Sequence, residues 1–205
     1  MNLMQMTQTI LQKIPRPMIP TLEDGDLIRG QSAFFQKHEA VLINEFYNLL
    51  YNDPSTQLTL GDPSLRKQRE RTLHQWYQVT TSGSFDADYW AWQTLVGVVH
   101  VKHKITNASM LSMWSWMVSF LQTRLLHELP TEQALPLINI LHKLHATVCS
   151  LIVESFLITQ QEAITRASGL NERILSRFIN IEIDLLLKQG RETLVQAQNL
   201  QSSAA

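Results

Sequence analysis

Cysteine, glycine and proline are all scarce in this 205-residue chain. The single cysteine, Cys149, cannot form an internal disulfide, which excludes a disulfide-stapled scaffold and predicts a reducing, cytoplasmic setting. The seven glycines and seven prolines leave long stretches without a break. Because no stretch of useful length alternates apolar and polar residues as a strand does, the sequence predicts an all-α fold.

An excess of positive charge is also absent. Lysine and arginine number 17 against 18 acidic residues, so the net charge is −1 and nucleic acid is not an expected partner. The N-terminus lacks the pattern of a secretory signal. The uncharged segment Ile105–Thr123 approaches the length of a membrane span, but its serines, threonines and amides make a buried helix the better interpretation.

Most of the common catalytic motifs are missing as well. There is no glycine-rich phosphate loop, no Cys-x-x-Cys, no His-Glu-x-x-His and no nucleophile elbow, so hydrolase and kinase chemistry has no support. A di-iron bundle would need Glu-x-x-His repeats, which do not occur.

Apolar residues recur with the period of amphipathic helices through most of the chain. We interpret residues 1–24 as an N-terminal extension, 25–168 as the main helical domain, and 169–205 as an extra C-terminal helix with a disordered tail. The expected helices, the second capped by Ser64, are Ser32–Asn52, Ser64–Thr80, Asp86–Asn107, Ala108–Leu129, Thr131–Ser168 and Leu170–Lys188.

Histidine is the residue type that could carry chemistry here. His100 lies in the apolar run Leu95–Val101, and a haem requires one neutral imidazole on a helix that faces an apolar slot. Gly97, one turn earlier, would let a flat ring approach the helix closely. A histidine on an apolar helix face is nevertheless more often a core residue bonded to a carbonyl, and both interpretations are open at this point.

Four segments, taken in order, favour the haem interpretation: Glu45–Leu50, Arg71–Trp76 with Ser82–Asp86, Tyr89–His100, and Met113–Phe120. On these segments, the run Phe46–Leu121 resembles the sensor-globin superfamily of globin-coupled sensors and protoglobins. Glu45–Leu50 is similar to the family's aromatic–tyrosine pair, and Arg71–Trp76 with Ser82–Asp86 to the distal helix and the link after it. Tyr89–His100 resembles the proximal helix, and Met113–Phe120 the start of the helix beneath the haem.

The resemblance implies a globin-like fold that holds haem b, with His100 as the iron ligand and Tyr47 as the donor to bound gas. Thr72 or Leu73 would form the distal wall, and a shift of one position would exchange them. The predicted cofactor-binding residues are His100, Tyr47, Phe46, Thr72, Leu73, Val96 and Trp116.

Two other histidines are candidate iron ligands, and one position differs from the family's usual residue. His103 could replace His100, although its neighbours Lys102 and Lys104 suggest a helix end near solvent. His74 could supply a sixth iron ligand. Lys104 stands where the family usually has glycine.

The resemblance further implies a gas sensor, with dioxygen as the first candidate and carbon monoxide or nitric oxide as others. No output domain fits after Ser168, so we expect a separate partner to read the signal. The stripe Ile174, Phe178, Ile181 and Leu185 suggests a homodimer through the last two helices. Two alternatives stay open: a haem enzyme, either a nitric oxide dioxygenase or peroxidase-like, and a haem-free regulatory module.

Overall fold

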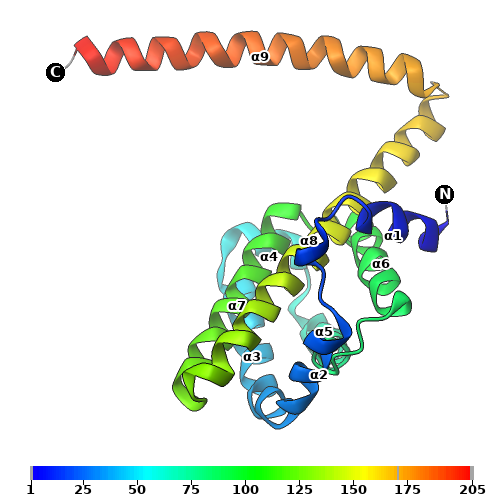
Figure 1. The fold of residues 1–205 in the computed structure, drawn as a ribbon. Coiled ribbons are helices and arrows are strands. Elements are labelled where there is room, and N and C mark those ends of the chain that lie inside the picture. The colour runs from blue at the N-terminus through cyan, green and yellow to red at the C-terminus, as the bar shows by residue number, and fades with distance from the viewer. Residues whose placement is uncertain (1, 170, 204–205) are drawn as a thin grey trace. The chain divides into compact units, whose positions relative to one another are not determined.

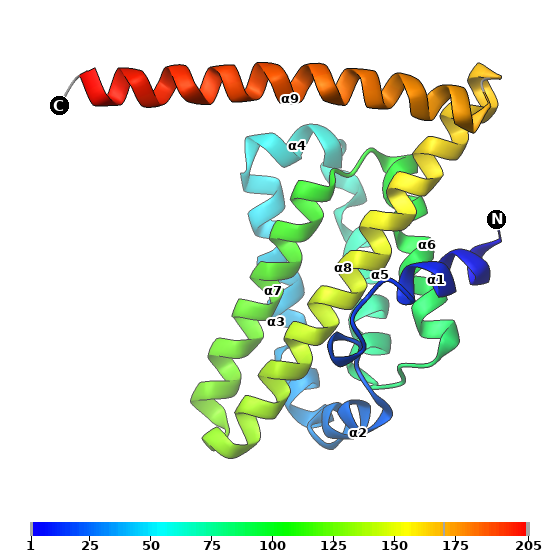
Figure 2. The same cartoon turned by 45° about the horizontal axis from the view of Figure 1, so that its top comes forward.

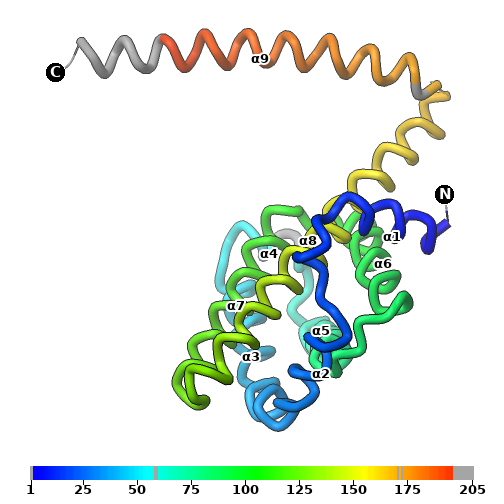
Figure 3. The backbone as a smooth tube through the Cα atoms, in the orientation of Figure 1, coloured from blue at the N-terminus to red at the C-terminus, as the bar shows by residue number. Residues whose placement is uncertain are grey.

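The computed structural model describes the backbone of residues 2–169 and 171–203, and the side chains within these ranges except those of 58, 59, 172 and 196–203. Every regular element in these ranges is helical, which confirms the predicted all-α class (Figures 1 and 3). The elements are α1 (Leu3–Leu11), η1 (Arg16–Met18), α2 (Leu22–Gly30), α3 (Ser32–Asn52), α4 (Pro54–Leu60), η2 (Pro63–Leu65), α5 (Arg66–Thr81), α6 (Ala87–His103), α7 (Asn107–Glu128), α8 (Thr131–Ser168) and α9 (Glu172–Ser203).

The chain forms two compact units, Met1–Thr159 and Gln160–Ala205. The first contains α1 to α7 and most of α8, and the second contains the end of α8 and α9. Within the first unit, α7 and α8 run antiparallel and side by side in both views (Figures 1 and 2). Their inner faces supply much of the core, including Leu125, Leu144 and Leu151 at no more than 1% exposure.

Local capping explains where the helix bounds differ from the predicted ones. Asp62, not Ser64, is the cap that starts the second predicted segment: its carboxylate accepts the Ser64 N–H at 2.8 Å and begins η2 before α5. Lys104 ends α6 early because it adopts a left-handed conformation with φ 56°. The last helix continues past the expected Lys188 to Ser203.

The N-terminal segment contains helices that the sequence analysis left as an extension. A capping box between Asn2 and Gln5 starts α1, and a second between Thr21 and Asp24 starts α2. α1 packs against α6, and the buried Thr7 hydroxyl donates to Thr94 Oγ1 at 2.8 Å. The N-terminal segment is therefore part of the body that supports α6.

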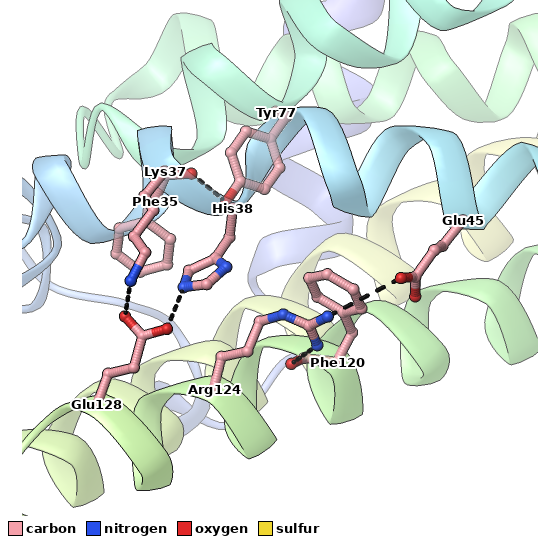
Figure 4. Close-up of polar contacts among 8 residues, drawn as sticks. All are labelled: Phe35, Lys37, His38, Glu45, Tyr77, Phe120, Arg124 and Glu128. Carbon is pink, nitrogen blue, oxygen red and sulfur yellow. Dashed lines mark hydrogen bonds and ion pairs between the residues drawn. The ribbon is translucent and has the colours of Figure 1, made fainter.

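α3 is fixed to both of its neighbours by polar contacts, which Figure 4 shows together. The Tyr77 hydroxyl of α5 donates to the Phe35 carbonyl at 3.0 Å. On the α7 side, Glu128 lies 2.8 Å from Lys37 and 2.9 Å from the His38 imidazole. These contacts hold the helix that carries Phe46 and Tyr47.

Gly97 marks the closest approach between α6 and α8. It is buried, and a Cβ there would overlap the Ser155 hydroxyl and the Ile152 carbonyl of α8. The expectation that Gly97 lets a flat ring approach is therefore wrong, because the space in front of it holds another helix. A second close approach joins Gly25 of α2 to Gly83 in the link before α6, backbone against backbone.

α8 is long and apolar enough to cross a membrane by length and composition alone. More than half of its most apolar window is buried inside the fold, as in the core helix of a globular domain. The segment Ile105–Thr123, which falls mostly in α7, does not meet the same test among the described residues.

Candidate functional site

His100 lies in the last turn and a half of α6 and is partly buried. Burial lowers the pKa of its imidazole to about 4, with a further contribution from the nearby His103. The ring is therefore neutral at pH 7, which is the form that binds a metal. Its Nδ1 is fully buried and has no hydrogen-bond partner among the described residues, whereas buried polar groups in proteins are nearly always paired.

Three of the predicted pocket residues lie together. The Phe46 ring lies edge-on to Tyr47, with centroids 5.3 Å apart, and also to Trp116 of α7 at 6.2 Å. Tyr47 is 7% exposed, and burial raises the pKa of its phenol, so it keeps its proton at any physiological pH. A buried phenol of this kind is a permanent hydrogen-bond donor.

Of the remaining predicted residues, two pack against the core and one is exposed to solvent. Leu73 of α5 and Val96 of α6 are partly buried and pack against the core, and Val96 is one turn before His100. Thr72 is exposed, and its hydroxyl donates to the Gln68 carbonyl of its own helix at 3.2 Å. Of these two candidates, Leu73 therefore packs against the core and Thr72 does not.

Most of the other histidines have partners or lie at the surface. The exception is the partly buried His145 of α8, whose pKa is lowered by burial and whose buried Nε2 has no hydrogen-bond partner among the described residues. His103 is exposed at the end of α6. His74 Nδ1 lies 2.8 Å from the Glu39 carboxylate, and its Nε2 lies 3.1 Å from Gln78. His74 borders an open groove of about 600 Å³ between α3 and α5. No group of three or more His, Cys, Asp or Glu side chains that could hold a metal ion occurs in the described ranges, but haem iron needs only one protein nitrogen.

The sequence analysis missed a polar pair next to Tyr47. Tyr51, one turn further along α3, has its ring centroid 6.3 Å from that of Tyr47. The Arg69 guanidinium of α5 donates to the Tyr51 hydroxyl at 2.8 Å. Arg69 is one helical turn before Leu73. That spacing was the only signal in the sequence that could have placed Arg69 on the same helix face as Leu73.

A buried polar side chain on α6 was also missed. Gln93 is fully buried, and its carbonyl accepts the Trp76 indole N–H at 2.9 Å. Trp76 lies edge-on to Trp114 at 5.3 Å, and Trp114 in turn contacts the His145 ring at 5.8 Å. This chain of rings ties α5, α6, α7 and α8 together on the side of the core toward the start of α6.

The predicted pocket residues have the chemical character that a haem site requires, but they would have to move apart to make room for the cofactor. A neutral, partly buried imidazole with an unpartnered nitrogen suits an axial ligand, and the other predicted pocket residues Val96, Leu73, Phe46 and Trp116 are apolar or aromatic and only partly buried. The interior cavity among α2, α3, α5, α7 and α8 measures about 20 Å³. That cavity is lined by other residues, among them Trp76, Tyr77 and Trp114. Since cofactor pockets usually measure about 300–1,000 Å³, it is too small for a haem, and binding would have to open a space beside His100.

Solved structures define the class of this fold. The chain is similar to the globin domain of the Geobacter sulfurreducens globin-coupled sensor, with a TM-score of 0.63 and 18% identity over 66% of this chain and 90% of that one. It is also similar to the ferric globin domain of Escherichia coli DosC, with a TM-score of 0.53 and 13% identity over 74% and 97% of the two chains. The fold is therefore that of a globin.

The family follows from the sequence. The Protoglobin family model matches residues 18–190, most of the chain, and the chain therefore belongs to the protoglobin family. The comparison with curated protein sequences gives no match. Membership in a globin family implies a haem site, and the recognition made from the four sequence segments is confirmed.

Proposed function

We propose that this protein binds haem b through His100 and reversibly binds a diatomic gas, dioxygen first, as a sensor. The observation that carries the proposal is the neutral, partly buried imidazole of His100 with its unpartnered Nδ1. His145 also has a buried, unpartnered nitrogen, so the choice of His100 as the ligand depends in addition on its place in the segment that resembles the proximal helix of the protoglobin family.

Haem supplies an iron with one coordination position for a small gas. The chain supplies the environment of that position. Tyr47 holds a phenol proton that can donate to the bound gas, and its place in the ring cluster with Phe46 and Trp116 limits its movement. Leu73, Val96 and the aromatic rings exclude water, which strengthens that hydrogen bond.

Replacing Tyr47 with phenylalanine tests this role. We expect dioxygen to dissociate from the reduced, haem-loaded variant about 10–100-fold faster, since a hydrogen bond to a partly charged acceptor contributes about 1.5–3 kcal/mol. Carbon monoxide, a weaker acceptor, should be affected far less. Stopped-flow dissociation rates measure both gases.

The matched control is Tyr77→Phe, which removes another buried hydroxyl whose bond to the Phe35 carbonyl is structural. It should leave the ratio of the two dissociation rates unchanged. Equal rates in wild type and Tyr47→Phe would show that Tyr47 is an ordinary core tyrosine.

We also propose a homodimer through α9, with a separate partner reading the signal. The stripe expected from the sequence is solvent-exposed on this helix: Ile174, Phe178, Ile181 and Leu185 are 40–57% exposed. Additional large apolar side chains on α9, such as Leu186 and Leu194, are exposed as well. Such a surface on one helix is typical of an interface.

Placing a charge in this stripe tests the dimer. We expect Phe178→Glu to convert the dimer into a monomer at micromolar concentration, because the buried charge would have no partner. Light scattering coupled to gel filtration measures the mass. Gln189→Glu, at an exposed polar position of the same helix, should leave the dimer intact. A wild-type protein that elutes as a monomer would refute the proposal.

The cytoplasmic location stays a prediction from the cysteine content.

A further inference from the structure

The groove between α3 and α5 has apolar side chains on one wall and cations on the other. From α3 it is lined by Ala40 and by Ile43, which is 7% exposed. From α5 it is lined by Lys67 and Arg71, which lie one helical turn apart and therefore on the same face of the helix. Its volume of about 600 Å³ is in the range of about 300–1,000 Å³ that small-molecule sites occupy. The groove is thus large enough for a small organic molecule.

Two polar bridges between α3 and α5 hold these walls in place. In the first, Arg66 Nε donates to the Glu70 carboxylate at 2.7 Å, and Arg66 Nη2 donates to Asn44 Oδ1 at 3.1 Å. In the second, His74 Nδ1 lies 2.8 Å from the Glu39 carboxylate. On both helices the four wall residues named above lie between the two bridges in the sequence. The groove is therefore held open before any ligand binds, which lowers the cost of binding.

The same bridges leave the groove with an excess of positive charge. Glu70 also lines the groove but is paired with Arg66, and Glu39 is 8% exposed and is not part of the lining. Lys67 and Arg71 form no ion pair with any residue whose side chain is described. The whole chain carries a net charge of −1, so this excess is local. A cleft with an excess of one charge concentrates ligands of the opposite charge.

We propose that this groove binds a small organic anion, whose apolar body packs on Ala40 and Ile43 and whose phosphate or carboxylate group is held by Lys67 and Arg71. The guanidinium fork of Arg71 can donate to two oxygens at once, and Lys67 adds a second positive charge. A bare inorganic anion would leave the apolar wall unused, and a neutral molecule would leave both cations without a partner.

This site is separate from the predicted haem pocket. Lys67 and Arg71 are exposed on α5, whereas Leu73 of the same helix packs against the core. None of the residues that line the groove is among the predicted cofactor-binding residues. The proposal therefore does not rest on haem binding.

1-Naphthyl phosphate is a suitable probe because it joins a flat apolar body to one phosphate group. We expect it to bind the full haem-free chain with a dissociation constant below about 1 mM, and 1-naphthol and inorganic phosphate to bind at least about tenfold more weakly. The double variant Lys67→Gln/Arg71→Gln should bind naphthyl phosphate about tenfold or more weakly than wild type. Isothermal titration calorimetry measures all of these affinities.

Two matched controls separate this groove from other surfaces. Arg173→Gln/Arg177→Gln removes two exposed cations with the same spacing from α9 and should leave the affinity within about twofold of wild type. Ala40→Glu places a carboxylate in the groove and should abolish binding. Ala33→Glu makes the same change at an exposed position of α3 outside the lining and should not. Circular dichroism verifies that each variant is folded.

The contrary outcomes are equally definite. An unchanged affinity in Lys67→Gln/Arg71→Gln, or a wild-type protein that does not bind the probe at about 1 mM, would overturn the proposal. Inorganic phosphate that binds as tightly as naphthyl phosphate would show anion capture by two cations alone, which overturns the organic ligand. Equally tight binding of 1-naphthol would show adsorption to an apolar surface and would overturn the proposal as well. Haem uptake is measured separately, so the failure of either proposal leaves the other standing.

Discussion

Replacing Gly97 with alanine should lower the free energy of unfolding by about 2 kcal/mol or more, although alanine is the better helix former by about 1 kcal/mol. The new methyl group would overlap the Ser155 hydroxyl and the Ile152 carbonyl oxygen, and the Ile152 carbonyl carbon would be 3.1 Å away. Backbone atoms cannot rotate out of the way, so α6 would have to move away from α8.

Urea unfolding of the haem-free protein, followed by far-ultraviolet circular dichroism, measures this change. Gly30→Ala is the matched control, because a Cβ at the end of α2 meets no atom within 4 Å. It should stay within about 0.5 kcal/mol of wild type. A Gly97→Ala variant as stable as wild type would contradict the close packing of α6 on α8. Because α6 carries His100, we also expect the variant to bind haem more weakly.

The second large effect concerns His100 in the haem-free chain. Leucine at this position should raise the stability at pH 7, because it removes a buried nitrogen without a hydrogen-bond partner, a group that costs about 1–3 kcal/mol. The same substitution should abolish haem binding. A gain in stability that accompanies a loss of binding is typical of a residue kept for function.

The pH dependence of stability follows from the lowered pKa of His100. Its value of about 4 in the folded chain, against an ordinary 6.5, means that the unfolded chain binds this proton more readily. Above pH 6.5 the protonation of His100 therefore costs no stability. As the pH falls from 6.5 toward 4, it lowers the free energy of unfolding by about 3 kcal/mol. Below pH 4 both states are protonated and the loss levels off.

Unfolding free energies measured between pH 7 and pH 4 test this behaviour in wild type and His100→Leu. The wild-type curve should fall more steeply by about 3 kcal/mol. His145, whose pKa burial also lowers, is present in both proteins and cancels in the difference. His127→Leu, at an exposed site on α7, should follow the wild-type curve. Parallel curves for wild type and His100→Leu would show that His100 is not buried as described.

The periodicity of apolar residues was enough to predict the long helices, because each buries one continuous face. α3 and α8 have the predicted bounds. The short helices α1, α2 and α4 were missed because each has at most nine residues, too few to establish a period, although α1 does bury Met6 and Ile10 on one face. The capping box of Thr21 and Asp24 could have been recognised from its spacing.

Only those site residues that lie in recognisable local sequence patterns could be predicted. His100 and Tyr47 came from family-like segments, and the roles that the resemblance implies for them stay predictions; the structure shows Tyr47 buried and His100 partly buried. Arg69 was missed because its partner Tyr51 is 18 positions away and the pairing depends on how α3 packs on α5. Gly97 was misinterpreted because a sequence does not tell whether a glycine makes room for a cofactor or for another helix.

The absorption spectrum of the purified protein, after reconstitution with haem, tests the central claim most directly. The account predicts a strong Soret band in wild type that shifts when the reduced protein takes up carbon monoxide or dioxygen, and that is lost in His100→Ala. The absence of a band in wild type would contradict the account and identify the chain as a haem-free globin module. A band that persists unchanged in His100→Ala would contradict the assignment of the ligand.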